Sequence, residues 1–148
     1  MIRLFDISVS DAVQGRLEEA VLKALRANQY ILGERVGRFE AEFAAYVDAP
    51  HAVGVGSGTD ALVLALRALG VGPGDEVVVP ALSFYASAEA VLLVGAEPVL
   101  VDIDPQTLNL SVSAAEAAIT ERTKALMPVH LYGCPADMGA VAELAAAH

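Results

Sequence analysis

The stretch AVGVGSGTDALVLALRALG, residues 52–70, decides the fold that this sequence predicts. Residues 52–55 form a short apolar run that is typical of a buried strand. The glycine-rich turn 56–59 follows, and residues 60–69 are strong helix formers closed by Gly70 at the position expected after a helix. A strand that leads through a tight turn into a helix is the repeating unit of α/β proteins, so this stretch indicates an α/β domain.

The alternation of strands and helices continues after this stretch. We expect helices at residues 83–94, at 113–119 with Ser113 as the cap, and from 137 onward, and strands at 76–79, 98–103 and 125–130. Strands that alternate with helices predict a mostly parallel sheet with helices on both faces. Only four strands are expected in total, so the sheet is predicted to be incomplete.

Two amphipathic helices are expected before this domain, at residues 13–27 and 34–47, because apolar side chains recur there at helical spacing. We therefore assign residues 1–50 to an N-terminal helical segment. Residues 51–148 are assigned to the first part of a larger, truncated domain, because the final helix shows no capping residue and no strand follows it.

The composition argues against several classes of protein. The chain has 148 residues, a net charge of −10 and no cluster of basic residues, which disfavours nucleic-acid binding because phosphate neutralisation needs Lys or Arg. The single Cys134 excludes an internal disulfide, and no Cys/His cluster has zinc spacing, so no metal site is expected. The sequence shows neither a signal-peptide pattern nor an apolar run long enough to span a bilayer. We therefore expect a soluble cytoplasmic protein without a membrane partner.

Gly56, Gly58 and Thr59 form a candidate phosphate site, since the N–H groups at the start of a helix are unpaired and the helix dipole is positive there. The alternative is a tight turn with a Ser, Thr or Asp cap. The nucleotide P-loop is excluded because its lysine is absent, and the dinucleotide motif is disfavoured because Thr59 stands where its third glycine would be. The residues of the turn alone leave the phosphate site and the capped turn both open.

Two further candidates, Phe84 and His130, follow predicted strands. Ligands of open parallel sheets bind at the carboxyl ends of the strands. Phe84 could stack on a flat ring or belong to the core, and His130 could touch a ligand or cap its strand. Asp102 is a weaker acid–base candidate, and Cys134 has no partner pattern.

Taken in order, segments spread over nearly the whole chain resemble the DegT/DnrJ/EryC1/StrS sugar aminotransferases, which have the type I fold of pyridoxal-phosphate enzymes. The segments are LG (32–33), VGRFE (36–40), GSGTDAL (56–62), LRALGVGPGDEV (66–77), SF (83–84), GAEPV (95–99), VDID (101–104), TKA (123–125) and PVHLYG (128–133). Each motif is modest alone, whereas the ordered series is specific.

The resemblance implies an α/β fold with the three-layer, mostly parallel sheet of the type I pyridoxal-phosphate transferase large domain, incomplete here and preceded by the helical segment. It implies pyridoxal 5′-phosphate as cofactor, and amino transfer from an amino acid, expected to be glutamate, to a keto group of a nucleotide-linked sugar. The product would serve the synthesis of cell-surface polysaccharide or of antibiotic sugars. Family members are commonly homodimers, and the resemblance places Tyr30 and Gly33 near the substrate at the dimer interface.

The resemblance also implies which residues bind the cofactor. The backbone amides of Thr59 and Asp60 would hold the phosphate, and Gly58 would allow its close approach. Phe84 would stack on the pyridine ring, and His130 would lie at the cofactor edge of the sheet.

Two groups of the family pattern are expected beyond His148: the aspartate that pairs with the pyridine nitrogen and the Schiff-base lysine. The lysines of this sequence, Lys23 and Lys124, do not match the family's lysine motif, so no catalytic residue is assigned and the chain alone is expected to be inactive. Three hypotheses follow. The chain is the N-terminal part of a sugar aminotransferase, part of a non-transaminating relative such as a sugar dehydratase or a regulatory protein, or a stand-alone binding fragment.

Overall fold

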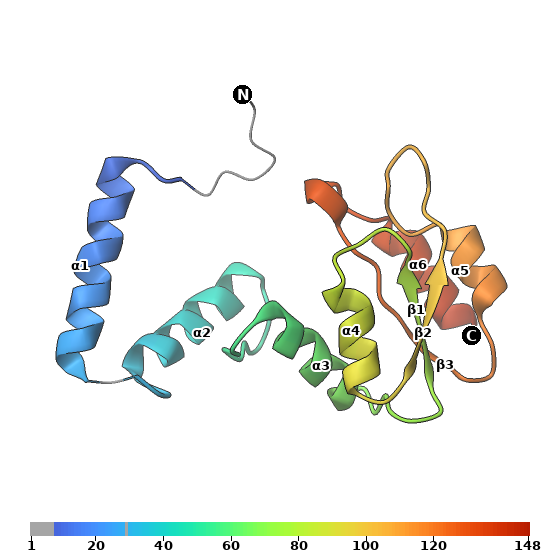
Figure 1. Cartoon of the computed structure of the whole chain (residues 1–148), viewed down its shortest axis with the longest axis horizontal. Helices are drawn as coiled ribbons and strands as arrows, with labels where there is room; N and C mark the ends of the chain where they lie inside the picture. Colours follow the sequence, from blue (N-terminus) through green and yellow to red (C-terminus); the bar gives the residue numbers. More distant parts are fainter. Residues whose placement is uncertain (1–7, 29) are drawn as a thin grey trace. The chain divides into compact units, whose positions relative to one another are not determined.

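The computed structural model describes residues 8–28 and 30–148, which separate into two compact units, Met1–Gly54 and Val55–His148. The helices within those described ranges are α1 (Asp11–Ala27), α2 (Glu34–Tyr46), α3 (Gly58–Ala68), α4 (Ala86–Leu93), α5 (Val112–Ala118), the 3-10 turn η1 (Leu131–Gly133) and α6 (Met138–Ala147), and the strands are β1 (Glu76–Pro80), β2 (Glu97–Val101) and β3 (Thr123–Leu126) (Figure 1). None of these helices is long and apolar enough to cross a membrane.

The N-terminal unit contains α1 and α2 with their connections (Figure 1). Both helices expected in this part of the sequence are therefore confirmed, with slightly different ends. The first helix ends at Asn28, whose left-handed backbone (φ 51°) is a conformation that asparagine tolerates better than most residues. No residue of α1 is buried, and α2 buries only Ala44. The apolar stripes that predicted these helices therefore find little packing within this unit.

The C-terminal unit is built on a parallel sheet of three strands in the order β2-β1-β3. The central strand β1 is buried along its whole length. Its run of valines explains this position, because consecutive β-branched residues suit a strand that is covered on both faces. The expected α/β class with a parallel sheet is confirmed.

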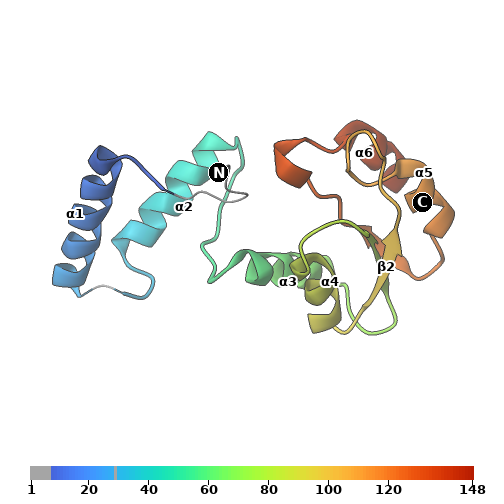
Figure 2. The ribbon, with the colours of Figure 1, turned by 45° about the horizontal axis from the view of Figure 1, so that its top comes forward.

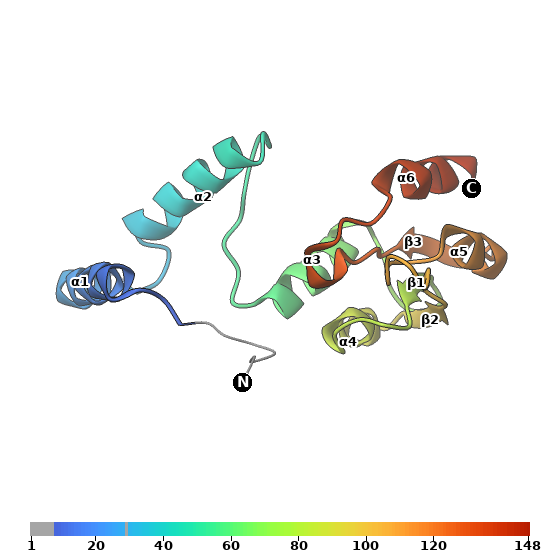
Figure 3. The same ribbon diagram turned by 90° about the horizontal axis from the view of Figure 1, so that it is seen from above.

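Helices cover both faces of the sheet, with α3 and α4 on one face and α5 and α6 on the other (Figures 1 and 3). Val77 and Val79 pack beneath α3 and α4, which lie side by side (Figure 2). Val78 points to the opposite face and packs with α5 and α6. These three side chains are almost completely buried, and each contributes about 1.5–3 kcal/mol relative to an exposed valine.

The strand expected at residues 52–55 is wrong: this segment forms no regular structure. A strand needs a neighbour for its backbone hydrogen bonds, and the sheet of the described residues does not include this segment. Val53 is exposed, and the Gly54 N–H donates to the Oε1 of Glu40 (2.7 Å). The apolar run indicated burial, but a local pattern does not show whether a neighbouring strand is present to pair with it.

Two helix starts also differ from prediction. The fourth helix begins at Ala86 rather than at residue 83, because the residues that follow β1 form a loop before the helix. The cap of α5 is Ser111 rather than Ser113, since the Oγ of Ser111 accepts a hydrogen bond from the Ala114 N–H (3.3 Å). The start of the last helix near residue 137 is confirmed, with Asp137 as its cap.

The third strand is shorter than the expected segment 125–130. After its last residue, the Met127 N–H donates one more hydrogen bond, to the Val78 carbonyl (2.9 Å). Pro80 of β1 and Pro128 of the departing segment have no N–H, so neither can donate a further hydrogen bond between the strands. The chain then turns through η1 toward the last helix.

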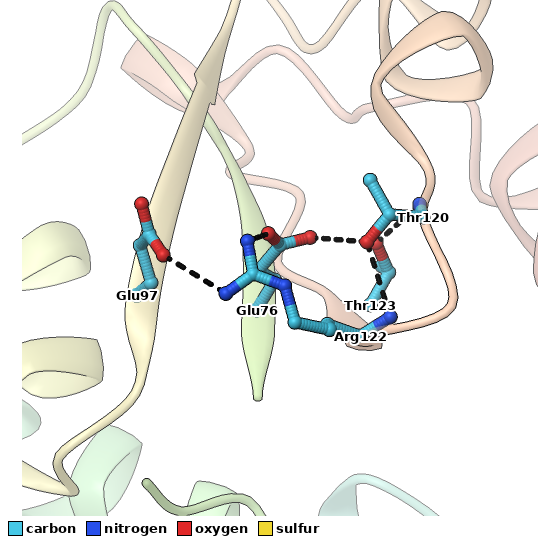
Figure 4. Close-up of polar contacts among 5 residues, drawn as sticks. All are labelled: Glu76, Glu97, Thr120, Arg122 and Thr123. Atoms are coloured by element: carbon cyan, nitrogen blue, oxygen red, sulfur yellow. Dashed lines mark hydrogen bonds and ion pairs between the residues drawn. The ribbon is translucent and has the colours of Figure 1, made fainter. Parts of the chain in front are cut away.

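Polar side chains at the amino end of the sheet form a closed network (Figure 4). Glu76 is only 4% exposed, and its carboxylate pairs with Arg122 and accepts a hydrogen bond from Thr120 Oγ1 (2.5 Å). The guanidinium of Arg122 also reaches Glu97 Oε2 (3.4 Å), so the network joins the starts of all three strands. Pairing and hydrogen bonding together offset the cost of burying this carboxylate.

Candidate functional site

A groove of about 600 Å³ lies at the carboxyl ends of the strands in the C-terminal unit. It is bordered by the start of α3, the loop between β1 and α4, and the segment that follows β3. Its lining residues include Gly58, Thr59, Ser83, Phe84, Ser87, His130 and Tyr132. Four of the five residues expected to bind a cofactor therefore line one groove, and the fifth, Asp60, does not.

The start of α3 presents unpaired backbone donors to this groove. Ser57 caps the helix, because its Oγ accepts the Asp60 N–H (3.1 Å) and its hydroxyl donates to Asp60 Oδ2 (2.9 Å). The N–H groups of Gly58 and Thr59 have no acceptor in the described part of the chain. These two amides and the positive end of the helix dipole suit an anion, whereas the Asp60 amide is already occupied by the cap. The capped turn and the anion site are therefore compatible in one segment.

The two glycines of this turn leave space for different groups. A Cβ on Gly56 would lie 2.9 Å from Asp60 Oδ2, so a larger residue there would make the Asp60 side chain shift away from the Ser57 hydroxyl. A Cβ on Gly58 would meet nothing within 4 Å, so the space above its backbone is open to a ligand.

Phe84 is 79% exposed at the groove, which excludes the alternative that it is a core residue. It belongs to the loop after β1, where a ligand of a parallel sheet is expected. In the same part of the groove, Ser83 Oγ and the buried Ser87 Oγ are 2.8 Å apart and hydrogen-bonded to each other. An exposed aromatic face beside unpaired amides fits a flat ring that carries an anionic group.

The ring of His130 is hydrogen-bonded to the loop that follows β3. Its Nδ1 accepts a hydrogen bond from the Ala136 N–H (2.9 Å), so the neutral ring carries its proton on Nε2. His130 thus lines the groove and also holds the loop that follows its strand, and its contact with a ligand stays a prediction.

Sequence reasoning missed Asn109, which organises the same loop. Asn109 is 4% exposed, and its Nδ2 donates to the carbonyls of Cys134 and Pro135 (3.1 Å each) while its Oδ1 accepts the Leu131 N–H (3.1 Å). It also missed Tyr132, which lines the groove with a left-handed backbone (φ 52°, ψ 27°). The neighbouring glycine in the sequence was the one available signal for this turn.

Asp104 orders the loop that carries Asn109. Its Oδ1 accepts the N–H groups of Thr107 and Gln106 (2.9 Å each), and its own N–H donates to the Asn109 carbonyl (2.9 Å). The hydrogen bond from the Thr107 amide, followed by that from Gln106, holds the pKa of Asp104 below its ordinary value.

Tyr30 and Gly33, expected near the substrate, lie in the N-terminal unit. They line a hollow of about 450 Å³ in the connection between α1 and α2. The Tyr30 hydroxyl is placed to donate to the Leu25 carbonyl or to Asn28 Oδ1 (2.9 Å each). Their role stays a prediction.

Neither lysine lines the groove. Lys23 pairs with Glu19 on α1 (2.7 Å), and Lys124 lines a different hollow, beside β3 and the last helix. Asp102 is not among the lining residues either. Across residues 8–28 and 30–148, no group of three or more His, Cys, Asp or Glu could hold a metal ion. The groove offers anion-binding amides and an aromatic face, and no amine for covalent attachment.

Comparison with known proteins gives a consistent family of matches. A model of the DegT/DnrJ/EryC1/StrS aminotransferase family matches residues 12–148. The chain is 55% identical over 126 residues to the UDP-N-acetyl-3-dehydro-alpha-D-glucosamine 3-aminotransferase of Acidithiobacillus ferrooxidans, covering 85% of this chain and 34% of that protein. It is 51% identical over 126 residues to the pleiotropic regulatory protein of Geobacillus stearothermophilus, with the same coverage of both chains.

A solved structure extends the likeness to three dimensions. The crystal structure of NtdA from Bacillus subtilis with bound cofactor PMP matches with a TM-score of 0.90 at 36% identity, covering 94% of this chain and 32% of that chain. The chain therefore spans about a third of the length of the relatives it matches. An incomplete α/β domain, as expected from the sequence, agrees with this coverage.

Proposed function

The chain belongs to the DegT/DnrJ/EryC1/StrS aminotransferase family, and from this premise we propose that its groove binds pyridoxal 5′-phosphate in a protein that aminates a nucleotide-linked keto sugar. One observation carries the proposal: a single groove is lined by the unpaired amides of Gly58 and Thr59 and by the exposed ring of Phe84. The similar Acidithiobacillus protein is a 3-aminotransferase of a UDP-linked keto sugar, which supports this substrate class.

Each lining residue has a proposed role that follows from its chemistry. The N–H groups of Gly58 and Thr59 bind the phosphate, and Asp60 contributes its amide once the bond to Ser57 is given up. Phe84 stacks on the pyridine ring. His130 offers its Nε2 proton to the ligand, because its Nδ1 is held by a backbone amide. When bound, the cofactor supplies the electron sink for amino transfer.

Further parts of the proposal concern the whole protein. We propose glutamate as the amino donor, a homodimer as the working form, and Tyr30 and Gly33 as residues near the sugar. Residues 51–148 would be the first part of the cofactor-binding domain, after a helical segment of residues 1–50. The chain alone would bind the cofactor without covalent attachment and without transaminase activity, since neither Lys23 nor Lys124 lines the groove.

The test is a titration of the chain with pyridoxamine 5′-phosphate, followed by the amide NMR signals of the groove. This probe carries no aldehyde, so it cannot react with lysine. We expect the largest shifts at Gly58 and Thr59, and competition by inorganic phosphate. Shifts confined to other segments, or no saturable binding, would contradict the assignment of the groove.

A second candidate function is supported by one specific relative. The chain is 51% identical to the pleiotropic regulatory protein of Geobacillus stearothermophilus, and that name does not mention amino transfer. The protein isolated from its source cells separates the two functions, because intact mass shows its length and an assay with glutamate and a UDP-linked 3-keto sugar shows its activity. Amino transfer supports the enzyme. Cofactor binding without amino transfer supports the regulatory role.

A further inference from the structure

Tyr132 has no evident structural reason to be where it is. Its side chain is 79% exposed, so it gains little from packing, yet it lines the groove. Its backbone has φ 52° and ψ 27°, a left-handed conformation that glycine and asparagine adopt far more readily than an aromatic residue. Disfavoured backbone conformations persist where the surroundings impose them, and they concentrate at ligand sites.

The buried side chain of Asn109 holds the loop in which Tyr132 lies. Its buried amide accepts from the Leu131 N–H, immediately before Tyr132, and donates to the carbonyls of Cys134 and Pro135, shortly after it. The three bonds join one side chain to backbone on both sides of the aromatic residue. Both amide protons and the amide oxygen are used, so the interaction is fully satisfied.

We infer that Tyr132 is a further ligand-contacting residue of the groove, and that Asn109 is the residue that positions it. The inference rests on the proposed function, because it takes a phosphorylated pyridine as the ligand. A tyrosine ring supplies an apolar face and a hydroxyl at low conformational cost, which suits contact with such a ring or with the group attached to it. Asn109 does not touch the ligand and acts through the loop alone.

The experiment measures the affinity of the chain for pyridoxamine 5′-phosphate by calorimetry. The variants are Tyr132→Asn, Asn109→Ala and the two combined. Asparagine tolerates the left-handed backbone, so Tyr132→Asn removes the ring without adding backbone strain. The control is Thr120→Val, which also removes a polar group bonded to a buried side chain, but at the amino end of the sheet.

We expect Tyr132→Asn to weaken binding about tenfold with no loss of melting temperature. Asn109→Ala should weaken binding by a similar factor, and adding it to Tyr132→Asn should cost at most about a further twofold, because it acts through the missing ring. Thr120→Val should bind within about twofold of the unaltered chain even where its melting temperature falls.

Affinity of Tyr132→Asn within about twofold of the unaltered chain would overturn the ligand contact. Losses that multiply in the double variant would overturn the positioning role of Asn109, since a merely structural residue lowers affinity independently of Tyr132. If the unaltered chain itself fails to bind the probe, the proposed function fails as well. That outcome is distinguishable because it precedes any substitution.

Discussion

The two ends of the sheet in the C-terminal unit use their polar and aromatic groups in opposite ways. At the amino end, the buried carboxylate of Glu76 is paired with Arg122 and hydrogen-bonded by Thr120. At the carboxyl end, the Gly58 amide has no acceptor in the described residues and the Phe84 ring is exposed. Satisfied groups stabilise a fold, whereas groups held without a partner are available to a ligand. Substitutions at the first end should therefore change stability, and substitutions at the second should change affinity.

The largest effect is expected for Arg122→Met at the amino end. It leaves the buried carboxylate of Glu76 with the Thr120 hydroxyl as its remaining partner, which should lower the free energy of unfolding by about 2 kcal/mol. Urea denaturation measures the loss. Glu97→Gln is the matched control, because it removes only the exposed, longer arm of the network and should cost less than about 1 kcal/mol. Weaker binding of pyridoxamine 5′-phosphate by folded Arg122→Met would break the contrast between the two ends.

Phe84→Ala should show the opposite pattern. We expect affinity for pyridoxamine 5′-phosphate to fall about tenfold through loss of the stacking face. Stability should change by less than about 0.5 kcal/mol because the ring is exposed. Tyr85→Ala is the control, since Tyr85 is also an exposed aromatic but does not line the groove. Equal losses of affinity in both variants would show that the ring at residue 84 has no special role.

Gly58→Ala should separate stability from affinity in a single variant. Alanine favours the helix and meets no atom within 4 Å, so the free energy of unfolding should rise by about 0.5 kcal/mol. The added methyl group occupies the approach to the helix start, so binding of inorganic phosphate should weaken. Gly15→Ala in α1 also meets nothing within 4 Å and should stabilise without changing binding. Unchanged phosphate binding in Gly58→Ala would remove the anion site from the start of α3.

The smallest effect concerns the pH dependence at Asp104. The folded-state pKa is lowered by hydrogen bonds from backbone amides, so this carboxylate contributes stability above its unfolded pKa. That contribution is lost as the pH falls through the folded value, below the ordinary aspartate range. Asp104→Asn should flatten this part of the stability–pH curve, as followed by thermal melts in acidic buffers. A curve that keeps its slope in the variant would assign the pH dependence to other carboxylates.

Local patterns predicted much of the fold. The helices near residues 13–27 and 34–47 follow from apolar spacing, and β1 follows from consecutive valines, because each of these signals lies within the segment itself. The prediction of a strand at residues 52–55 was wrong because strand pairing depends on a neighbour elsewhere in the chain. The cap of α5 was misplaced because two nearby serines carry the same chemistry and only one reaches the free amide.

The candidate site was predictable to a similar extent. Phe84 could be predicted because it follows the end of an expected strand, where ligands of parallel sheets bind. Gly58 could be predicted because it stands at the start of an expected helix, where backbone amides are unpaired. The role of Asn109 could not be predicted from the sequence, since its three hydrogen-bond partners lie 22 to 26 residues further along the chain. Tyr132 was missed because its conformation is imposed by that distant amide. Long-range hydrogen bonds of a loop leave no periodic trace in sequence.

The order of the strands also has a consequence for synthesis on the ribosome. The central strand β1 is made first, yet its partners begin at Glu97 and Thr123. The valines of β1 therefore remain without sheet partners while the following segment is translated. This takes on the order of seconds at ordinary elongation rates. During that interval the nascent chain exposes its most β-prone segment. Slow codons between the first and second strands would lengthen this exposure, and a chaperone that binds extended apolar segments would act most effectively there.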